Sequence, residues 1–472
     1  MAGMCGVFGV FAPSKPVAHL TYLGLYALQH RGQESAGMAV ADVESSLTVV
    51  KDMGLVPNVF DDRTLAALSG THAIGHCRYS TTGSSTWRNA QPVYRDVGQH
   101  QFALGHNGNL TNTEALAETA GMLPGVATSD TDLVAELLAQ HMTATGSDLV
   151  DALAAVLPRL EGAYSLVLVD DGQIIGARDP EGFRPLCLGR LDDGWVLASE
   201  TPALDIVGAE MVRELEPGEI VAIDAEGPRT VRIVPAEAVE PRLCLFEFVY
   251  FARPDAQLYG SNVAAARARM GELLAEQAPL AADHQHPERP AMVMPVPESG
   301  VPAAQGYARA SGIPYGDGLV KNRYIGRTFI APSQELRARS VRLKLNPLRV
   351  AIAGKRLVVV DDSIVRGTTT RAVVTMLREA GAAEVHLRIM SPPYRWPCFY
   401  GMDTADRDEL LASRLSEDEI REYIGADSLA YLTLDRLVAA TGAPGAGFCD
   451  ACLTGDYPVP VPLTLTKSVL ER

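Results

Sequence analysis

The sequence contains no apolar run long enough to cross a membrane, about 18 residues, so we expect no transmembrane helix. Its first residues lack the basic and apolar stretches of a secretion signal, and we therefore expect a cytoplasmic protein. Basic residues are outnumbered: 41 Lys and Arg stand against 57 Asp and Glu, a formal net charge of −16. Because such a surface repels nucleic acid and anionic membranes, we expect neither as a partner.

Cysteine is also scarce, since the 472 residues include only 7. An odd number of cysteines in a long chain without a secretion signal argues against a disulfide framework. Reactive or metal-bound thiols are the better interpretation. Cys187 lies in an apolar context typical of a protein core, and the sequence assigns no role to Cys77.

The composition, 47% hydrophobic and 21% charged residues, is typical of globular proteins, and the length predicts two or three domains. A Pro-, Glu- and Arg-rich stretch at 225–242 predicts the boundary, with domains at 5–235 and 243–472. Alternating apolar residues predict strands and helices in the first domain, which suits sheets packed between helices. We expect strands at 5–12, 35–42, 163–171, 195–199 and 219–224, and helices at 19–29, 131–142 and 147–160.

The second domain shows a different pattern, in which short buried strands alternate with helices. Strands are predicted at 291–297, 356–362 and 384–390, and a helix at 370–382. This order is typical of a βαβ unit and therefore of a parallel sheet covered by helices.

The stretch VVVDDSIVRGTTT (358–370) places two acids and a polar loop directly after a buried strand. The carboxyl edge of a parallel sheet is where α/β proteins bind ligands. Backbone N–H groups of the loop and the following helix N-terminus suit a phosphate, whereas Asp361 and Asp362 suit ribose hydroxyls or Mg²⁺. A solvated turn capped by two acids is the alternative.

This stretch resembles the phosphoribosyl-pyrophosphate (PRPP) signature of type I phosphoribosyltransferases. The resemblance implies that Asp361 and Asp362 serve ribose and metal, and that the loop binds the 5-phosphate. PVPESG (295–300) resembles the pyrophosphate loop of that family. The PRPP-binding residues implied are Glu298, Ser299, Gly300, Lys321, Arg323, Asp361, Asp362, Ser363, Ile364, Val365, Arg366, Gly367, Thr368 and Thr369. Mg²⁺ is the implied cofactor, a single ion per subunit on Ser299, Asp361 and Asp362.

Basic residues concentrate between Lys321 and Arg349, where Glu335 is the only acid. A solvated basic face and a site for a small polyanion are both compatible with this pattern. The segment 321–347 resembles the lid that closes over PRPP in the family, whose cations would neutralise the pyrophosphate leaving group.

Cys5 is followed by four polar, mostly glycine-rich motifs: HRGQES (30–35), GHCRYSTTG (75–83), GHNGNL (105–110) and TSDTD (128–132). Together they resemble the glutaminase domain of class II amidotransferases, an N-terminal-nucleophile hydrolase with an αββα sandwich. The resemblance makes Cys5 the nucleophile, and it implies that residues 1–4 are a leader to be removed. A freed α-amino group has a pKa of about 7.7–8.0 and can act as the base.

The same resemblance implies the remaining glutaminase residues. Asn107 and Gly108 would form an oxyanion hole, worth about 3–4 kcal/mol per donor. Arg78 would bind the α-carboxylate of glutamine and Asp132 its α-ammonium group, while Arg31 and Gly32 would shape the pocket. As isolated residues, Arg78 and Asp132 would be ordinary ion-pair partners.

Cys449 and Cys452 have a metal-compatible spacing, and Cys244 and Cys398 could join them. From spacing alone, a zinc site comes ahead of an iron site, and unrelated core thiols are the alternative. The surrounding segments resemble those of amidotransferases that carry a [4Fe–4S] cluster. This resemblance makes the four cysteines ligands of a single structural cluster per subunit.

A glutaminase followed by a phosphoribosyltransferase is the order of the amidophosphoribosyltransferase family, which the whole chain resembles, in its iron–sulfur type. The resemblance implies that 5-phosphoribosylamine, glutamate and pyrophosphate form from PRPP, glutamine and water, the first committed step of de novo purine synthesis. It further implies an apolar ammonia passage between the domains, a homotetramer and inhibition by purine nucleotides. Another class II amidotransferase and an inactive PRPP-sensing regulator are the alternatives.

Overall fold

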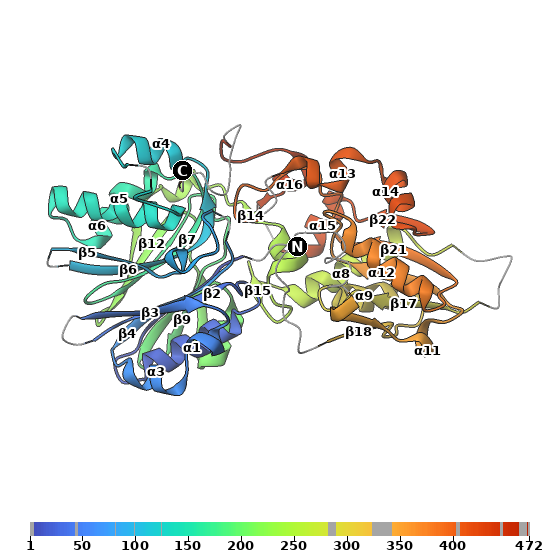
Figure 1. The fold of residues 1–472 in the computed structure, drawn as a ribbon, viewed down its shortest axis with the longest axis horizontal. Helices are drawn as coiled ribbons and strands as arrows, with labels where there is room; N and C mark the ends of the chain where they lie inside the picture. Colours follow the sequence, from blue (N-terminus) through green and yellow to red (C-terminus); the bar gives the residue numbers. More distant parts are fainter. Residues whose placement is uncertain are drawn as a thin grey trace.

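The computed structural model describes residues 4–42, 46–80, 82–98, 100–123, 125–281, 289–322, 342–402, 406–443, 447–461 and 470. The chain forms two lobes that follow each other in sequence (Figure 1). Among the described residues, no helix is both long and apolar enough to cross a membrane.

Two antiparallel sheets face each other in the first lobe (Figure 1). The first has the order β11(Glu210–Glu214), β9(Cys187–Leu191), β10(Gly194–Ala198), β1(Gly6–Phe11), β4(His72–Arg78), β2(Ser35–Ala41) and β3(Leu47–Met53). The second has the order β13(Gly227–Arg232), β12(Glu219–Asp224), β8(Ile174–Arg178), β7(Gly162–Val169), β6(His100–Leu110) and β5(Val93–Val97). Residues such as Val7, Ile74 and Val167 fill the space between the sheets.

Helices cover the outer face of each sheet. α1(Val17–Ala27) and α7(Thr201–Val207) pack on the first sheet, and α5(Asp130–Thr145) and α6(Leu149–Val156) pack on the second. The layers are therefore helix, sheet, sheet, helix, which confirms the predicted αββα sandwich. Each of the strands and helices expected here is present, and all of their bounds lie within a few residues of the prediction.

The second lobe is built on a parallel sheet, also as expected, with the order β17(Ala291–Pro295), β20(Arg356–Asp361), β21(Glu384–Ile389) and β22(Ser428–Tyr431). One face is covered by α8(Val263–Gln277), α9(Val301–Ser311) and α15(Leu434–Thr441). The other face is covered by α12(Thr368–Glu379) and α14(Glu417–Ile424). The carboxyl ends of β17 and β20 are neighbours, so the two loops expected to bind PRPP meet at one edge.

The two lobes are joined by several segments. Leu243–Cys244 (β14) pairs in parallel with Phe448–Cys449 (β23), and the one-turn helix Glu247–Phe251 (η4) follows. Near the end of the chain, Leu470 packs in the hydrophobic cluster of α5 and α6, so residues of the predicted second domain also contact the first lobe.

Candidate functional site

Cys5 lies immediately before β1, the strand between β10 and β4. Only 7% of the residue is exposed, and burial raises the pKa of its thiol to about 11, outweighing the lowering effects of the Tyr79 hydrogen bond and Arg78. The thiol is therefore protonated at neutral pH. A nucleophilic role needs a base that removes this proton.

Asn107 and Gly108 lie on β6, whose sheet packs against β1 and β4. Asn107 is fully buried, and neither polar atom of its side chain has a hydrogen-bond partner within the described part of the chain. A buried amide without a partner is energetically unfavourable, and at such a position it indicates a ligand atom to be bound. At Gly108 a Cβ atom would lie 2.0 Å from the carbonyl oxygen of Ala163, so only glycine fits.

Arg78 ends β4, and its guanidinium lies inside the loop that follows. It donates hydrogen bonds to the carbonyls of Ser84 at 3.0 Å and Thr82 at 3.2 Å. Its charge also acts on the Cys5 thiol. Arg78 is thus a buried cation near the nucleophile, the position expected for the residue that binds the α-carboxylate of glutamine.

Two carboxylates act on the Cys5 thiol by their charge, Asp130 and Glu34, and Asp132 is not one of them. Asp132 receives a hydrogen bond from Arg95 at 2.6 Å and is partly exposed. Asp130 is buried and acts on the Cys5 thiol by its charge. Burial would raise the pKa of Asp130, but the interaction with His106 and the backbone N–H groups of Thr131 and Leu110 lower it overall, so this carboxylate stays ionised. Asp130, and not Asp132, is therefore the acid of the TSDTD motif whose charge reaches the nucleophile.

The Arg31 side chain lies in the protein interior, not in a substrate pocket. Its Nε donates to the carbonyl of Cys5 at 3.0 Å, and its remaining donors bind the carboxylates of Glu200 and Glu247. All three partners belong to the protein, so Arg31 acts on the backbone of Cys5 and on two carboxylates. Gly32 packs directly on the backbone of Cys77 and Arg78, where a Cβ atom would clash.

Two further cysteines have structural positions. The thiol of Cys77 donates to the carbonyl of Leu28 at 3.3 Å under β1, which assigns this residue to the core. The thiol of Cys187 donates to the carbonyl of Ala198 at 3.2 Å and belongs to the same cluster, as the sequence indicated.

The second lobe places Asp361 at the end of β20 and Asp362 directly after it. Burial, together with the neighbouring carboxylate, raises the pKa of Asp361 well above its usual value, and burial raises that of Asp362. The hydroxyl of Ser299 donates to Asp362 across the sheet edge, and Ser363 Oγ donates to it at 2.7 Å. The predicted metal-binding residues Ser299, Asp361 and Asp362 are thus together.

The two PRPP loops meet because their backbones pack closely. Val296 N–H donates to the carbonyl of Val360 at 2.8 Å, and a Cβ atom on Gly300 would lie 2.5 Å from the same oxygen. Glu298 and Lys321, both predicted to bind PRPP, form a 3.1 Å ion pair with each other at the surface. Arg323 and most of the predicted lid fall in 323–341, outside the described residues.

The predicted phosphate loop connects β20 to α12. Ser363 is buried, Ile364 anchors the loop in the core beneath the sheet, and Arg366 pairs with Glu409. Thr368 and Thr369 form the first turn of α12, with Gly367 and Val365 before it. The backbone N–H groups at this helix start have the dipole that favours a phosphate.

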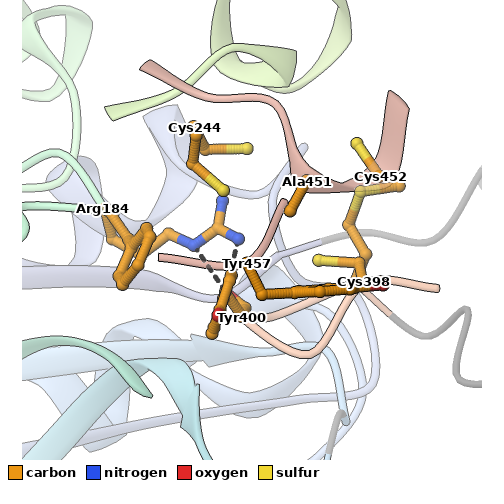
Figure 2. Close-up of a pocket in the computed structure, with 10 residues that line it drawn as sticks. Arg184, Cys244, Cys398, Tyr400, Ala451, Cys452 and Tyr457 are labelled. Atoms are coloured by element: carbon orange, nitrogen blue, oxygen red, sulfur yellow. Dashed lines mark hydrogen bonds between the residues drawn. The ribbon is translucent and has the colours of Figure 1, made fainter. Parts of the chain in front are cut away.

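The four predicted cluster cysteines line a single pocket at the junction of the lobes. Cys244, Cys398 and Cys452 surround it together with Arg184, Tyr400 and Tyr457 (Figure 2), and Cys449 completes the set. Within the described ranges, no three or more His, Cys, Asp or Glu side chains are arranged as for a metal ion. Burial raises the pKa of the Cys449 and Cys452 thiols well above the usual value.

Comparisons with known proteins match both lobes. A glutamine amidotransferase domain model matches residues 76–206, and a phosphoribosyl transferase domain model matches residues 271–390. The amidophosphoribosyltransferase of Mycobacterium tuberculosis is 54% identical over 99% of this chain and 89% of its own length. The Bacillus subtilis enzyme of the same name is 45% identical over 97% of this chain and 94% of its own. The chain belongs to the amidophosphoribosyltransferase family.

Solved structures agree with this assignment. One, described as the allosteric regulatory enzyme of purine biosynthesis, is 44% identical, covers 99% of both chains and has a TM-score of 0.89. Another, the glutamine PRPP amidotransferase from B. subtilis complexed with ADP and GMP, has a TM-score of 0.88 at the same identity and coverage. The chain is therefore a pentosyltransferase with glutamine amidotransferase activity. A match over both lobes favours this function over another class II amidotransferase or an inactive PRPP-sensing regulator.

Proposed function

We propose that the chain performs its reaction as two half-reactions, with Cys5 acting in the first lobe and the Asp361–Asp362 pair in the second. Glutamine is hydrolysed to glutamate and ammonia at Cys5. Ammonia then displaces pyrophosphate from PRPP and forms 5-phosphoribosylamine. The observation that carries the proposal is that a cation and an anion, Arg78 and Asp130, both act on the buried Cys5 thiol. They match the carboxylate and ammonium groups of a bound amino acid.

In the glutaminase half-reaction, the Cys5 sulfur attacks the side-chain amide carbon of glutamine. Its proton goes to the α-amino group of Cys5, which becomes available when residues 1–4 are removed. The oxygen of the tetrahedral intermediate takes the hydrogen bonds of the Asn107 amide and the Gly108 N–H. The proton passes to the departing ammonia, and water then releases glutamate from the thioester.

In the second half-reaction, the loop from Ser363 to Thr369 holds the 5-phosphate of PRPP, and Asp361 and Asp362 orient the ribose. We propose Mg²⁺ on Ser299, Asp361 and Asp362, because two buried carboxylates beside a hydroxyl form the kind of oxygen donor set that Mg²⁺ prefers. When bound, the ion would neutralise charge on the pyrophosphate group. Lys321 is available for the same group once its ion pair with Glu298 opens.

Ammonia must reach PRPP before water protonates it, so we also propose an apolar passage between the lobes. Met4, next to the nucleophile, is buried in the hydrophobic cluster of the second lobe. When residues 1–4 are removed, the apolar side chains that now surround Met4 would lie next to the α-amino group of Cys5.

For the pocket of Cys244, Cys398, Cys449 and Cys452 we propose a structural [4Fe–4S] cluster. The donor set fits, because four thiols from three distant segments line one pocket, and the buried cation Arg184 would balance the negative charge of the group. A four-iron cluster is wider than a single ion, so its ligands need not converge as those of zinc do. When bound, it would join these segments without taking part in either half-reaction.

We further propose that the chain forms a homotetramer inhibited by purine nucleotides. The related structure that holds ADP and GMP supports the nucleotides. Light scattering would give the oligomeric state, and assays with added AMP, ADP and GMP would show inhibition.

The whole proposal is tested by supplying PRPP, Mg²⁺ and glutamine. Pyrophosphate should appear only when all three are present, in an amount equal to the glutamate formed above the basal hydrolysis of glutamine. Glutamate release with no pyrophosphate at saturating PRPP would exclude the second half-reaction.

A further inference from the structure

Glu247, a residue of the second lobe, is buried between two arginines of the first. It is fully inaccessible to solvent at the start of η4. Its carboxylate accepts hydrogen bonds from Arg31 at 2.7 and 3.1 Å, and it lies 3.5 Å from Arg184. Such bidentate, charge-assisted pairs fix both partners in direction as well as in distance.

Arg31 carries this contact to the nucleophile. The same guanidinium that binds Glu247 donates from Nε to the backbone carbonyl of Cys5 at 3.0 Å. Its other partner, Glu200, belongs to the first lobe. The carbonyl of Cys5 is thus held by a side chain whose orientation depends on a carboxylate of the other lobe.

The segment that carries Glu247 is itself held rigidly. The buried side chain of Arg267 donates to the carbonyls of Phe248 and Ala252 at 2.8 Å each. Arg253 N–H donates to Glu200 at 2.9 Å. The backbone that carries the carboxylate is therefore fixed at both ends of η4.

We infer that Glu247 is a positioning residue for the glutaminase reaction, fixing the nucleophile Cys5 through Arg31. The inference rests on the proposed role of Cys5. Glu247 touches neither glutamine nor the sulfur. Its loss would leave Arg31 with Glu200 alone, and the guanidinium would shift toward that carboxylate. A small displacement of a nucleophile lowers the rate of the chemical step far more than it lowers binding.

The test compares Glu247→Gln with Glu214→Gln, a matched control. Glu214 is also a largely buried carboxylate of the lobe junction, accepting a hydrogen bond from the Tyr259 N–H at 2.5 Å, but it has no contact with Arg31. The readout is the ratio of glutamine-dependent to ammonia-dependent phosphoribosylamine synthesis, which is independent of the folded fraction. The kcat and KM for glutamine and the alkylation rate of Cys5 by iodoacetamide are measured in parallel.

We expect the ratio to fall about ten- to a hundredfold in Glu247→Gln, through kcat and not KM, with slower alkylation of Cys5. Glu247→Asp, which keeps the charge but is shorter, should recover part of the ratio. Glu214→Gln should keep the ratio of the unaltered chain. An unchanged ratio in Glu247→Gln would overturn the inference. An equal fall of the ratio in Glu247→Gln and Glu214→Gln would also overturn it.

Cys5→Ala is included to distinguish an error in the proposed nucleophile from an error in the proposed positioning role of Glu247. If Cys5→Ala keeps glutamine-dependent synthesis, the proposed nucleophile is wrong, and the inference falls with it. If Cys5→Ala abolishes that synthesis and Glu247→Gln does not change the ratio, only the positioning role is excluded.

Discussion

The thiol of Cys5 and the backbone of Tyr79 are joined by two hydrogen bonds. The sulfur donates to the Tyr79 carbonyl at 3.3 Å, and the Tyr79 N–H donates to the sulfur at 3.5 Å. Because Tyr79 directly follows Arg78, the proposed nucleophile and the proposed carboxylate clamp are held by the same stretch of backbone. A shift of the Arg78 backbone on glutamine binding would therefore also move Tyr79 and the sulfur that it contacts.

Cys5→Ala should separate the two half-reactions. Glutamine-dependent synthesis should be lost, since no other group can form the thioester, whereas synthesis from high ammonia at alkaline pH should continue. Glutamine should still bind through Arg78 and Asp130, neither of which needs the sulfur. Rates with both nitrogen sources are measured on folded protein. A parallel fall of the two rates would make Cys5 a structural residue.

Asp130→Asn should weaken glutamine binding, because it removes the carboxylate proposed to contact the ammonium group. A hydrogen bond to a charged group is worth about 1.5–3 kcal/mol, so KM for glutamine should rise about ten- to a hundredfold. Asp132→Asn is the control: it alters the partly buried pair with Arg95, whose charges are not among those acting on the Cys5 thiol, and should leave KM nearly unchanged. A larger rise of the KM for glutamine in Asp132→Asn than in Asp130→Asn would identify Asp132 as the glutamine ligand.

Asp361→Asn and Asp362→Asn should nearly abolish synthesis with either nitrogen source. Each change removes a negative charge beside the ribose, where positive charge develops as pyrophosphate leaves. Glutamine hydrolysis without PRPP should persist, since Cys5 lies in the other lobe. Initial rates of pyrophosphate and glutamate release check this prediction, and normal pyrophosphate release in both variants would contradict it.

Cys449→Ser should affect folding and not chemistry. Cys449 in β23 lies opposite Cys244 in β14 in the parallel strand pair. Loss of the Cys449 thiol as a cluster ligand should therefore release both segments and lower the melting temperature. Purified unaltered protein should be brown, with about four irons and labile sulfide per chain. Colourless protein with stoichiometric zinc would indicate a different metal. Protein that contains no iron and no zinc would exclude a metal site at these cysteines.

Active protein should begin at Cys5. The nitrogen of Cys5 is an amide while Met4 precedes it, and an amide is not a base at neutral pH. Intact-mass analysis of active enzyme should therefore show loss of residues 1–4. Full glutamine-dependent activity in a preparation that retains Met4 would exclude the α-amino group as the base.

Local patterns in the sequence were sufficient for much of the fold and for parts of both sites. Short apolar runs predicted β1, β7 and β12, and the apolar run before Asp361 predicted β20 with its loop and helix. These signals are local, because a strand or helix must bury one face wherever it packs. The motifs around Cys5, Asn107 and Arg78 could be found for the same reason.

The choice between Asp130 and Asp132 needed the structure. Both belong to one motif, but on α5 two residues separated by two positions point in different directions. Which of them faces the nucleophile depends on how the helix sits on its sheet. No pattern within five residues contains that information.

By itself, the sequence determined the two-domain order and the layered and parallel sheets, and it predicted the nucleophile and the phosphate loop, because the motifs for each are short stretches of the chain. Only the tertiary structure decided what Arg31 does. Its partner Glu247 lies 216 residues away, and the pair exists because two lobes close over two buried charges. A buried ion needs a counter-ion to offset its desolvation, and the one it finds is set by packing, not by sequence distance.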